Sequence, residues 1–524
     1  MQTDNNLRNY GPYQAALKDD WEGLKSFFEP KDLDKKQGPA AAALSTPLTA
    51  AGDTAFHLAV FSQREEPLKS FLSIGQRNPM TTFDFSIKND YGNTALHEAA
   101  ANGNIEAVTL LVNHINGLSF GDEEYLSSEA LEDKNNEGET PLFRAAAYGR
   151  TKVVKFLAPK SSEDGKLKDS IHRKTLIRKE PKPDASNPPV ASREIKEVVN
   201  EDNSAVANQG EIIEVLDASI LHIAIQGQHF ETALELLKLD ESLATMKDMK
   251  GRASLHLLAT IPSAFKSGYR MGAWINRVFY FCLPIDDRID EEKGSCLNLG
   301  KGLRFGDNEE DEKTSCLNLF KGWPILGKIC EPVREICQEK RKHKLALRLA
   351  KSLIAKDPTW IESIAEATQA SATDSDEQGK TQVRRAEKDS KSTPLLLATE
   401  RGIVEIVEEI LEIFPELVED RNHLNQNILH VAIKHRQTEI FDHVKNMKIP
   451  MTRLVRVVDT DGYTILHHAA YMEHETTDIH PAGPVYELQE EINWYKVCAG
   501  VGDQSPLRVT VHLHDAHRVS LPGE

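Results

Sequence analysis

The chain has 524 residues, of which 40% are hydrophobic and 27% charged, so it is long enough and apolar enough to bury a sizeable core. Its formal net charge is -18 at pH 7 and its pI is near 5.6. This acidity argues against the dense basic surface of a nucleic-acid-binding protein, and it favours basic partners only weakly.

Two observations predict a cytoplasmic protein without a membrane span. The six cysteines include no C-x-x-C pair, and the N-terminus MQTDNNLRNY is too polar for a signal peptide, so reduced thiols are expected. The most apolar run, VFYFCLPI from Val278 to Ile285, is far shorter than the roughly 20 residues that cross a bilayer.

One sequence pattern recurs along the chain. A degenerate copy, GPYQAALKDDWEGLKSFF, begins at Gly11, and clear copies, AGDTAFHLAVFSQREEPLKSFL and DYGNTALHEAAANGNIEAVTLLV, begin at Ala51 and Asp90. Further copies begin at Glu137, Asp217, Lys250, Lys391, Asn425 and Asp461. A period of about 33 residues with a T-x-L-H-x-A core resembles the ankyrin repeat, a β-turn followed by two antiparallel helices. The resemblance predicts an all-α ankyrin-repeat solenoid.

Each copy contains the residues that the turn and the helices need. In one copy, Asp90-Tyr91-Gly92 predicts a tight turn in which Gly92 takes a positive φ, and Thr94 predicts a helix N-cap. Small residues such as Ala99 let the first helix approach its neighbours, and an apolar stripe marks the second helix. One unit cannot bury both of its faces alone, so the copies are expected to stack.

The repeats are interrupted twice. Residues 159–211, which contain KEPKPDASNPPVAS, predict a disordered insertion, and residues 265–390 predict a linker that contains one helix over 339–356. Ankyrin repeats are therefore expected over 8–158, 212–264 and 391–475. A further helix is expected over 476–497, and the atypical tail 498–524 shows neither a repeat nor an apolar span.

Six histidines occupy one recurring slot of the repeat. We interpret them as structural residues that bridge the Thr hydroxyl and the neighbouring backbone at each turn. Phe143 and Leu396 fill the same slot in two other copies, and neither side chain can bind a metal or act as a base. The six are His57, His97, His222, His256, His430 and His467.

Other signals of chemistry are weak. His467, His468 and His474 lie close together, but no H-E-x-x-H motif accompanies them. The segment GSCLNLGKG at Gly294 fails as a phosphate loop, because Gly302 stands where Ser or Thr must hold magnesium. No catalytic residue, metal or cofactor is therefore expected, and the chain is predicted not to be an enzyme.

The predicted function is protein binding. Stacked repeats give a rigid concave face of turn tips and first helices, on which one or more protein partners bind. Tyr91 and Tyr463 are the predicted anchors, because exposed aromatic side chains give a large contact area at low entropic cost. The alternative, that a given residue only forms its turn, stays open for each position. The predicted partner-binding residues are Lys88, Asn89, Tyr91, Asn93, Asn136, Glu137, Met249, Arg252, Asp461 and Tyr463.

Several segments resemble one family of plant ankyrin proteins, whose repeats precede a membrane segment called the PGG domain. The segments are YQAALKDDWEGLKSFF, KHKLALRLAKSLI, TPLLLATERGIVEIVEEILEIFPELV and ELQEEINWYKV, the last ending at Val497. The family includes accelerated cell death 6 and the ITN-type salt-tolerance proteins. The resemblance implies a role in plant defence or stress signalling, with full-length relatives in the plasma membrane or endomembranes.

The likeness stops at Val497, so this chain resembles the family without its membrane domain. Two functions of different class follow. The first is a soluble interaction scaffold. The second is a soluble or truncated form of a membrane-anchored ankyrin regulator of transport or immune-receptor traffic.

Overall fold

The computed structural model describes two compact units, Met1–Leu257 and Leu258–Glu524. The described residues are 11–28, 44–62, 64–76, 86–117, 130–160, 162–163, 166–167, 174–179, 213–248, 251–269, 280–281, 326–357, 392–447, 451–470 and 484–502.

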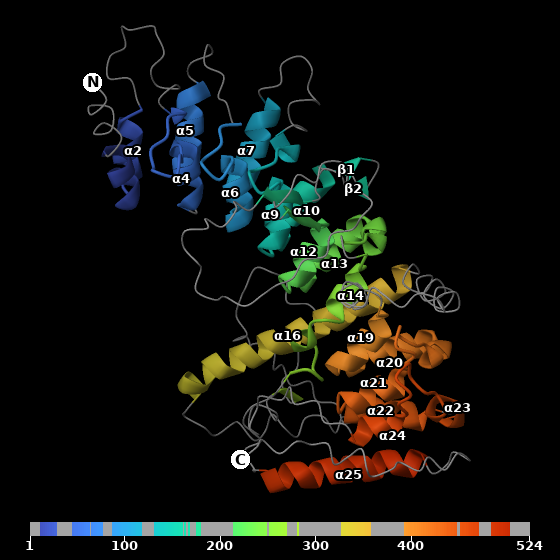
Figure 1. The fold of residues 1–524 in the computed structure, drawn as a ribbon. Coiled ribbons are helices and arrows are strands. Elements are labelled where there is room, and N and C mark those ends of the chain that lie inside the picture. The colour runs from blue at the N-terminus through green and yellow to red at the C-terminus, as the bar shows by residue number, and fades with distance from the viewer. Residues whose placement is uncertain are drawn as a thin grey trace, which may run out of the picture. The chain divides into compact units, whose positions relative to one another are not determined.

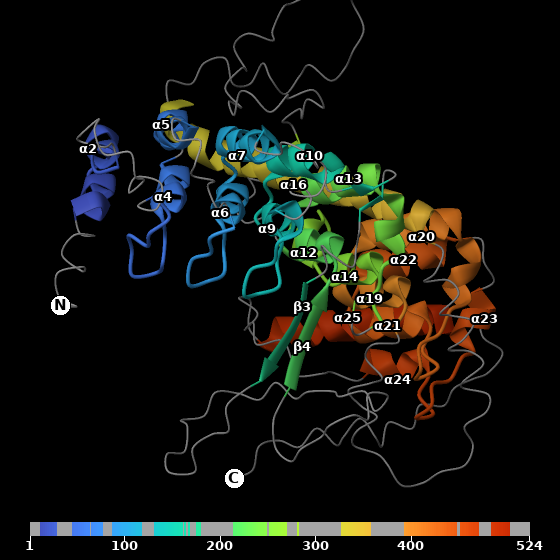
Figure 2. The ribbon, with the colours of Figure 1, turned by 90° about the horizontal axis from the view of Figure 1, so that it is seen from above.

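Unit 1 is built from pairs of helices that follow one another along the chain (Figure 1). The first helices lie in one row and the second helices in another, and neighbours within each row are in contact (Figure 2). The first helices are α4 (Ala55–Phe61), α6 (Ala95–Asn102), α9 (Pro141–Ala147) and α12 (Ile220–Gln226). The second helices are α5 (Glu65–Gln76), α7 (Ile105–Gly117), α10 (Thr151–Leu157) and α13 (Phe230–Leu239). Residues 11–17 and α2 (Trp21–Ser26) form a further pair before them.

The copy at Asp90 shows why this sequence forms these elements. Thr94 caps α6 by accepting a hydrogen bond from the backbone N–H of His97, and Gly103 ends the helix in the left-handed conformation with φ 77°. Ala99 and Ala100 are completely buried, so the backbones of neighbouring first helices pack closely. The predicted turn, cap and small-residue contacts are confirmed in this copy.

One helix end differs from the expected pattern. Gly227 ends α12, but its φ is -73° and the next residue, Gln228, takes the left-handed conformation with φ 58°. A Cβ added to Gly227 would lie 2.7 Å from Cδ2 of His229. Close packing, rather than a positive φ, is therefore what requires glycine at this position.

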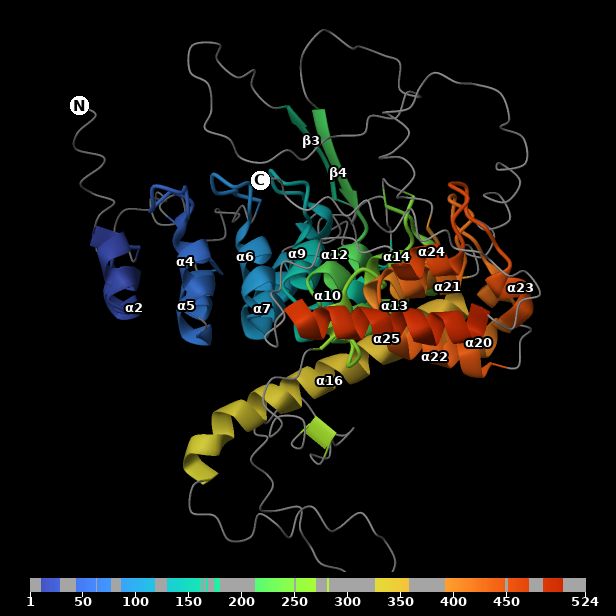
Figure 3. The ribbon, with the colours of Figure 1, turned by 60° about the horizontal axis from the view of Figure 1, so that its bottom comes forward.

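Part of the predicted disordered insertion is ordered. β1 (Ser162–Glu163) pairs with β2 (Lys166–Leu167), and β3 (Lys174–Lys179) pairs with β4 (Ile213–Ala218), both antiparallel. β3 and β4 extend from the side of unit 1 on which the turns before α6 and α9 lie (Figure 3). The expectation of disorder is wrong for β1, β2 and β3, and β4 lies in the range 212–264, where a repeat was expected. KTLIRK and IEVLDA contain β-branched and aliphatic residues, which favour a ladder. Unit 1 also contains the short helices η1 (Ala158–Lys160) and η2 (Glu241–Thr245), and α14 (Ser254–Leu258) crosses the boundary between the units.

Unit 2 repeats the two-row arrangement. Its first helices are α19 (Pro394–Arg401), α21 (Ile428–Lys434) and α24 (Ile465–Ala470), and its second helices are α20 (Val404–Ile413) and α22 (Thr438–Asn446). The shorter helices are η3 (Pro262–Ala264), η8 (Pro415–Glu419) and α23 (Met451–Val455). Pro394 occupies the first turn of α19, where its missing N–H costs no hydrogen bond.

Two long helices flank these repeats. α16 (Leu326–Lys356) packs on α20, and Ala346, Leu349 and Leu353 are completely buried. It begins well before the expected residue 339. The expectation rested on the leucine stripe, which indicates a packed face and is present only in the C-terminal half of the helix.

The second flanking helix is α25 (Pro484–Gly502), which packs on α24. It continues beyond the expected end at residue 497 because the side chain of Cys498 is completely buried. Trp494 packs edge-on against Phe441, with ring centroids 5.4 Å apart, and the carboxylate of Glu491 accepts hydrogen bonds from Nε and Nη2 of Arg436. The first residues of the predicted atypical tail therefore belong to this helix, and residues 503–524 lie outside the described residues.

Candidate partner-binding face

The turns between repeats are held by an Asn or Asp side chain at a fixed place. The Oδ1 atom of Asn89 accepts hydrogen bonds from the backbone N–H groups of Tyr91, at 3.1 Å, and Asn93, at 3.0 Å. In unit 2, Asp459 Oδ1 accepts in the same way from the N–H groups of Asp461 and Tyr463. Such side-chain-to-backbone bonds fix a turn without a partner molecule.

Successive turns of unit 1 are also joined to one another. The backbone N–H of Asn136 donates to the carbonyl of Tyr91 at 3.1 Å, and the side chain of Asn135 donates to Oδ1 of Asn93 at 2.8 Å. One turn earlier, the side chain of Asn89 donates to Oδ1 of Asp53 at 2.9 Å. The backbone of each tip is therefore fixed by its neighbour as well as by its own turn.

In three copies of unit 1, the histidine of the recurring slot joins the first helix to the next repeat. The backbone N–H of Thr94 donates to Nδ1 of His97 at 3.2 Å, so Nδ1 is the acceptor and Nε2 carries the proton. Nε2 lies 3.0 Å from the carbonyl oxygen of Glu139, which belongs to the next repeat. His57 makes the same pair of contacts with Thr54 and the carbonyl of Asn93. The structural interpretation is confirmed for His57, His97 and His222, whose Nδ1 contacts the Thr or Ser hydroxyl and whose Nε2 contacts a carbonyl of the next repeat.

Burial keeps the ring of His97 neutral. Desolvation lowers the pKa of His97 from 6.5 to about 4, against the opposing effect of the hydrogen bond to the Glu139 carbonyl. The pKa of His256 and that of His430 are each lowered to about 4, again chiefly by desolvation. In His97 the neutral ring keeps Nδ1 available as an acceptor for the turn. Nδ1 of His430 instead donates to Oδ1 of Asn427 at 2.8 Å. Phe143 and Leu396 fill the slot as completely buried apolar side chains.

We call the turn tips of unit 1 at residues 49–54, 88–94 and 133–140, together with the exposed sides of α4, α6 and α9, the turn face. Tyr91 is an exposed aromatic residue on it, with 65% of its surface accessible. Asn136 and Glu137 are exposed on the next tip. Lys88 is exposed but bridges to that tip, donating to Asp133 at 2.6 Å and to the carbonyl of Lys134 at 2.7 Å.

Two of the predicted binding residues are not exposed. Asn89 and Asn93 are buried, and their side-chain amides are occupied by Asp53, by the turn backbone and by Glu98, whose Oε1 accepts from Asn93 Nδ2 at 2.6 Å. The prediction that these two asparagines are exposed is therefore wrong, because the sequence does not show which way a turn side chain points.

The remaining predicted residues lie on other turns. The guanidinium of Arg252 is bound by Asp248 at 2.8 and 2.9 Å, and Met249 lies outside the described residues. In unit 2, Asp461 is exposed. Tyr463 is 49% exposed, and its ring lies 5.6 Å from that of His467 and 5.9 Å from that of His468. Tyr463 thus supports its own repeat, unlike Tyr91.

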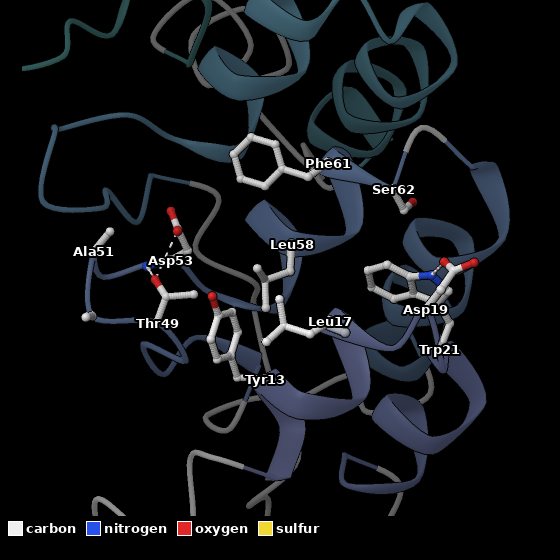
Figure 4. A pocket seen from close by; sticks show the side chains of 12 residues that line it. Tyr13, Leu17, Asp19, Trp21, Thr49, Ala51, Asp53, Leu58, Phe61 and Ser62 are labelled. Carbon is white, nitrogen blue, oxygen red and sulfur yellow. Dashed lines mark hydrogen bonds between the residues drawn. The ribbon is translucent and has the colours of Figure 1, made fainter.

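Sequence reasoning missed a cleft at the N-terminal end of the turn face. It has a volume of about 550 Å³, and Leu17 and Leu58 face each other within it, with Tyr13 and Phe61 on either side (Figure 4). Asp53 lies at one end, where its carboxylate accepts a hydrogen bond from the hydroxyl of Thr49 at 2.9 Å. The signal was present in the sequence as large apolar residues at repeat positions that hold alanine in the next two copies.

The described residues include no cluster of three or more histidine, cysteine, aspartate or glutamate side chains able to hold a metal ion. His474, one of the three histidines considered for a metal site, lies outside those residues. Within the same part of the chain, no helix has both the length and the apolar character needed to cross a bilayer.

The sequence comparisons agree with this geometry. A family model described as ankyrin repeats, with three copies, matches residues 13–169. The chain contains ankyrin repeats. Outside the matched residues, α12 and α13 and the helix pairs of unit 2 have the same turn, cap and two-row arrangement. No curated protein is significantly similar to the chain. Ankyrin repeats are a protein–protein interaction module, which makes the turn face the candidate binding site.

Proposed function

We propose that the chain is a non-enzymatic scaffold that binds a protein partner on the turn face, the concave side of its stacked ankyrin repeats. The observation that carries this proposal is the pairing of a fixed backbone with an exposed aromatic side chain at Tyr91. Both neighbours of Tyr91 in the turn, Asn89 and Asn93, are buried and hydrogen-bonded, so binding orders little of the chain.

The cellular setting is a further part of the proposal. The resemblance of YQAALKDDWEGLKSFF, KHKLALRLAKSLI and ELQEEINWYKV to the PGG-domain ankyrin family supports a role in plant defence or stress signalling. The polar N-terminus and the reduced cysteines expected from the sequence support a cytoplasmic location.

The test compares two equally exposed tyrosines. Tyr486 on α25 is 62% exposed, close to the 65% of Tyr91, but it lies on a helix of unit 2 and is not part of the turn face. The full-length chain, its Tyr91→Ala variant and its Tyr486→Ala variant are used as baits, and captured proteins are quantified by mass spectrometry. We expect one or more proteins to be depleted about tenfold or more by Tyr91→Ala, the size of effect that loss of an aromatic anchor gives, and to be retained by Tyr486→Ala.

A photo-crosslinking amino acid placed at either position gives the second readout. The depleted proteins are expected to crosslink from position 91 and not from position 486. Circular dichroism spectra that match the wild type exclude unfolding as the cause. Equal capture by both variants, or crosslinks from position 486 alone, contradicts the proposal.

A further inference from the structure

The cleft at the N-terminal end of the turn face has an apolar floor that the fold does not need. Leu17 and Phe61 occupy one repeat position, the last residue of the first helix in their copies. In the next two copies that position is held by Ala101 and Ala147. Because the repeat folds with alanine there, packing of the solenoid does not explain the two large side chains.

These two side chains are also largely outside the core. Leu17 is 68% exposed and Phe61 is 45% exposed, although both are large and apolar. Leu58, which is only 9% exposed, lines the base of the cleft from a position that holds Glu98 and Arg144 in the following copies. Large apolar side chains gathered at exposed positions mark an interaction site more often than isolated ones do.

The cleft is also acidic. Its lining contains two carboxylates, Asp19 and Asp53, and no cationic side chain. Asp19 is neutralised by an ion pair with Arg64 at 2.7 Å, and it also holds the indole of Trp21 in place by accepting from Nε1 at 2.6 Å. Asp53 accepts hydrogen bonds from Thr49 and Asn89, which are both uncharged. The negative charge of Asp53 is therefore available to a cation brought by a ligand.

From this arrangement we infer that the cleft binds a short peptide segment of a protein partner, in which a large apolar side chain stands close to an arginine or lysine. The apolar side chain lies between Leu17, Leu58 and Phe61, and the cation pairs with Asp53. The volume of about 550 Å³ accommodates more than one side chain. The high exposure of Leu17 gives a shallow site, which suits a peptide better than a small molecule that must be mostly enclosed.

This inference rests on the proposed function, since it names a subsite of the turn face and the chemistry of the partner. It is tested by selecting a phage-displayed library of random dodecapeptides on the immobilised full-length chain. We expect the enriched peptides to share a leucine, isoleucine, phenylalanine or tryptophan within a few residues of an arginine or lysine. Synthetic peptides of the enriched sequences are then used as the probes in titrations.

The variants copy residues that the chain itself uses at equivalent positions. Leu17→Ala with Phe61→Ala reproduces the alanines of the next two repeats, and we expect it to weaken peptide binding about tenfold or more. Asp53→Asn is expected to weaken binding about threefold at low salt and less at high salt, because it removes one screened charge pair. Tyr148→Ala is the control, since Tyr148 is an exposed aromatic residue at the end of α9 outside the cleft, and it is expected to leave binding unchanged.

The other outcomes are decisive as well. Enrichment of acidic peptides, no enrichment at all, or binding that survives Leu17→Ala with Phe61→Ala overturns the cleft assignment. If that double variant has no effect on the peptides while Tyr91→Ala abolishes their binding, the cleft inference fails and the proposed function of the turn face stands. If the double variant abolishes peptide binding and Tyr91→Ala affects no protein partner, the cleft inference stands and the proposed role of Tyr91 in partner binding fails.

Discussion

Protonation of His97 is expected to weaken unit 1 in mildly acidic solution. The ring must stay neutral, because Nδ1 accepts from the N–H of Thr94 while Nε2 donates to the carbonyl of Glu139. Burial lowers its pKa in the folded chain to about 4, against 6.5 in the unfolded chain. The unfolded state therefore binds more protons between these values. The contribution of the neutral His97 ring to the stability of the folded chain is therefore complete above pH 6.5 and is lost as the pH falls toward 4.

The size of the effect follows from the two pKa values. Linkage predicts that His97 alone lowers the free energy of unfolding by about 2 kcal/mol between pH 7.5 and pH 5.0. The matched variant is His97→Phe, because Phe143 fills the same slot as a completely buried ring. At pH 7.5 this variant is expected to be less stable than the wild type by about 1 to 3 kcal/mol, since Thr94 and Glu139 lose their partner.

The assay is amide hydrogen exchange of the segment 95–112, followed by mass spectrometry and corrected for the intrinsic pH dependence of exchange. A local readout is needed because the repeats of a solenoid open independently. The stability gap between the wild type and His97→Phe should narrow by about 2 kcal/mol on going from pH 7.5 to pH 5.0. Tyr486→Ala, a surface change in unit 2, should track the wild type at both values. A gap that stays constant across this window refutes the assignment of the neutral ring.

Three other changes probe the turn, the C-terminal helix and the buried thiol. Gly92→Ala should destabilise unit 1 by more than about 1 kcal/mol in urea unfolding, because Gly92 has φ 74° and an added Cβ would lie 2.5 Å from the backbone N of Asn136. A variant as stable as the wild type would contradict this interpretation. Arg436→Ala removes the bidentate partner of Glu491, so hydrogen exchange over 484–502 should speed up while α19 is unchanged, and protection equal to the wild type would rule out this role. Burial raises the pKa of the Cys498 thiol to about 12, so native protein should alkylate at this residue far more slowly at pH 8 than protein in urea; equal rates would show the thiol to be accessible.

The repeat could be predicted because its key residues recur at fixed positions and act locally. Thr94 caps a helix whose first turn contains His97, so the spacing T-x-x-H already contains the geometry of the contact. Substitution of the histidine by Phe143 and Leu396 identified its role as structural. The alanines of the first helices were interpretable for the same reason, since small residues at helical spacing have one common use in stacked helices.

The direction of turn side chains could not be predicted from one copy. Asn89 and Tyr91 are both polar or amphipathic turn residues, yet one is buried and the other is exposed. A signal existed in the comparison of copies, because Asn or Asp recurs five residues before the capping position, as the histidines recur after it. The members of this set are Asn89, Asn135, Asp248, Asn422 and Asp459. In each of them, Oδ1 accepts from the backbone N–H four residues later.

The extent of the flanking elements depended on tertiary contacts that periodicity does not show. α16 begins before its leucine stripe, and α25 continues past Val497, with the side chain of Cys498 completely buried. β3 and β4 pair across a separation of more than thirty residues, which no local pattern specifies. Composition carries no information about such long-range pairing.

Recurring positions of the repeat stabilise the solenoid, whereas varying positions are available for binding a partner. A position that recurs, such as that of Asn89 or His97, is occupied by contacts within and between repeats, and those contacts leave no hydrogen-bonding capacity for a partner. A position that varies while the fold is unchanged, such as that of Leu17 and Phe61, is free to be selected for something outside the fold. Since the recurring contacts also fix the backbone beneath the varying side chains, a partner meets a surface whose ordering cost has already been met during folding. Recognition by this chain is therefore expected to change between relatives at the varying positions of the turn face, whereas the stability of the stack changes at the recurring ones.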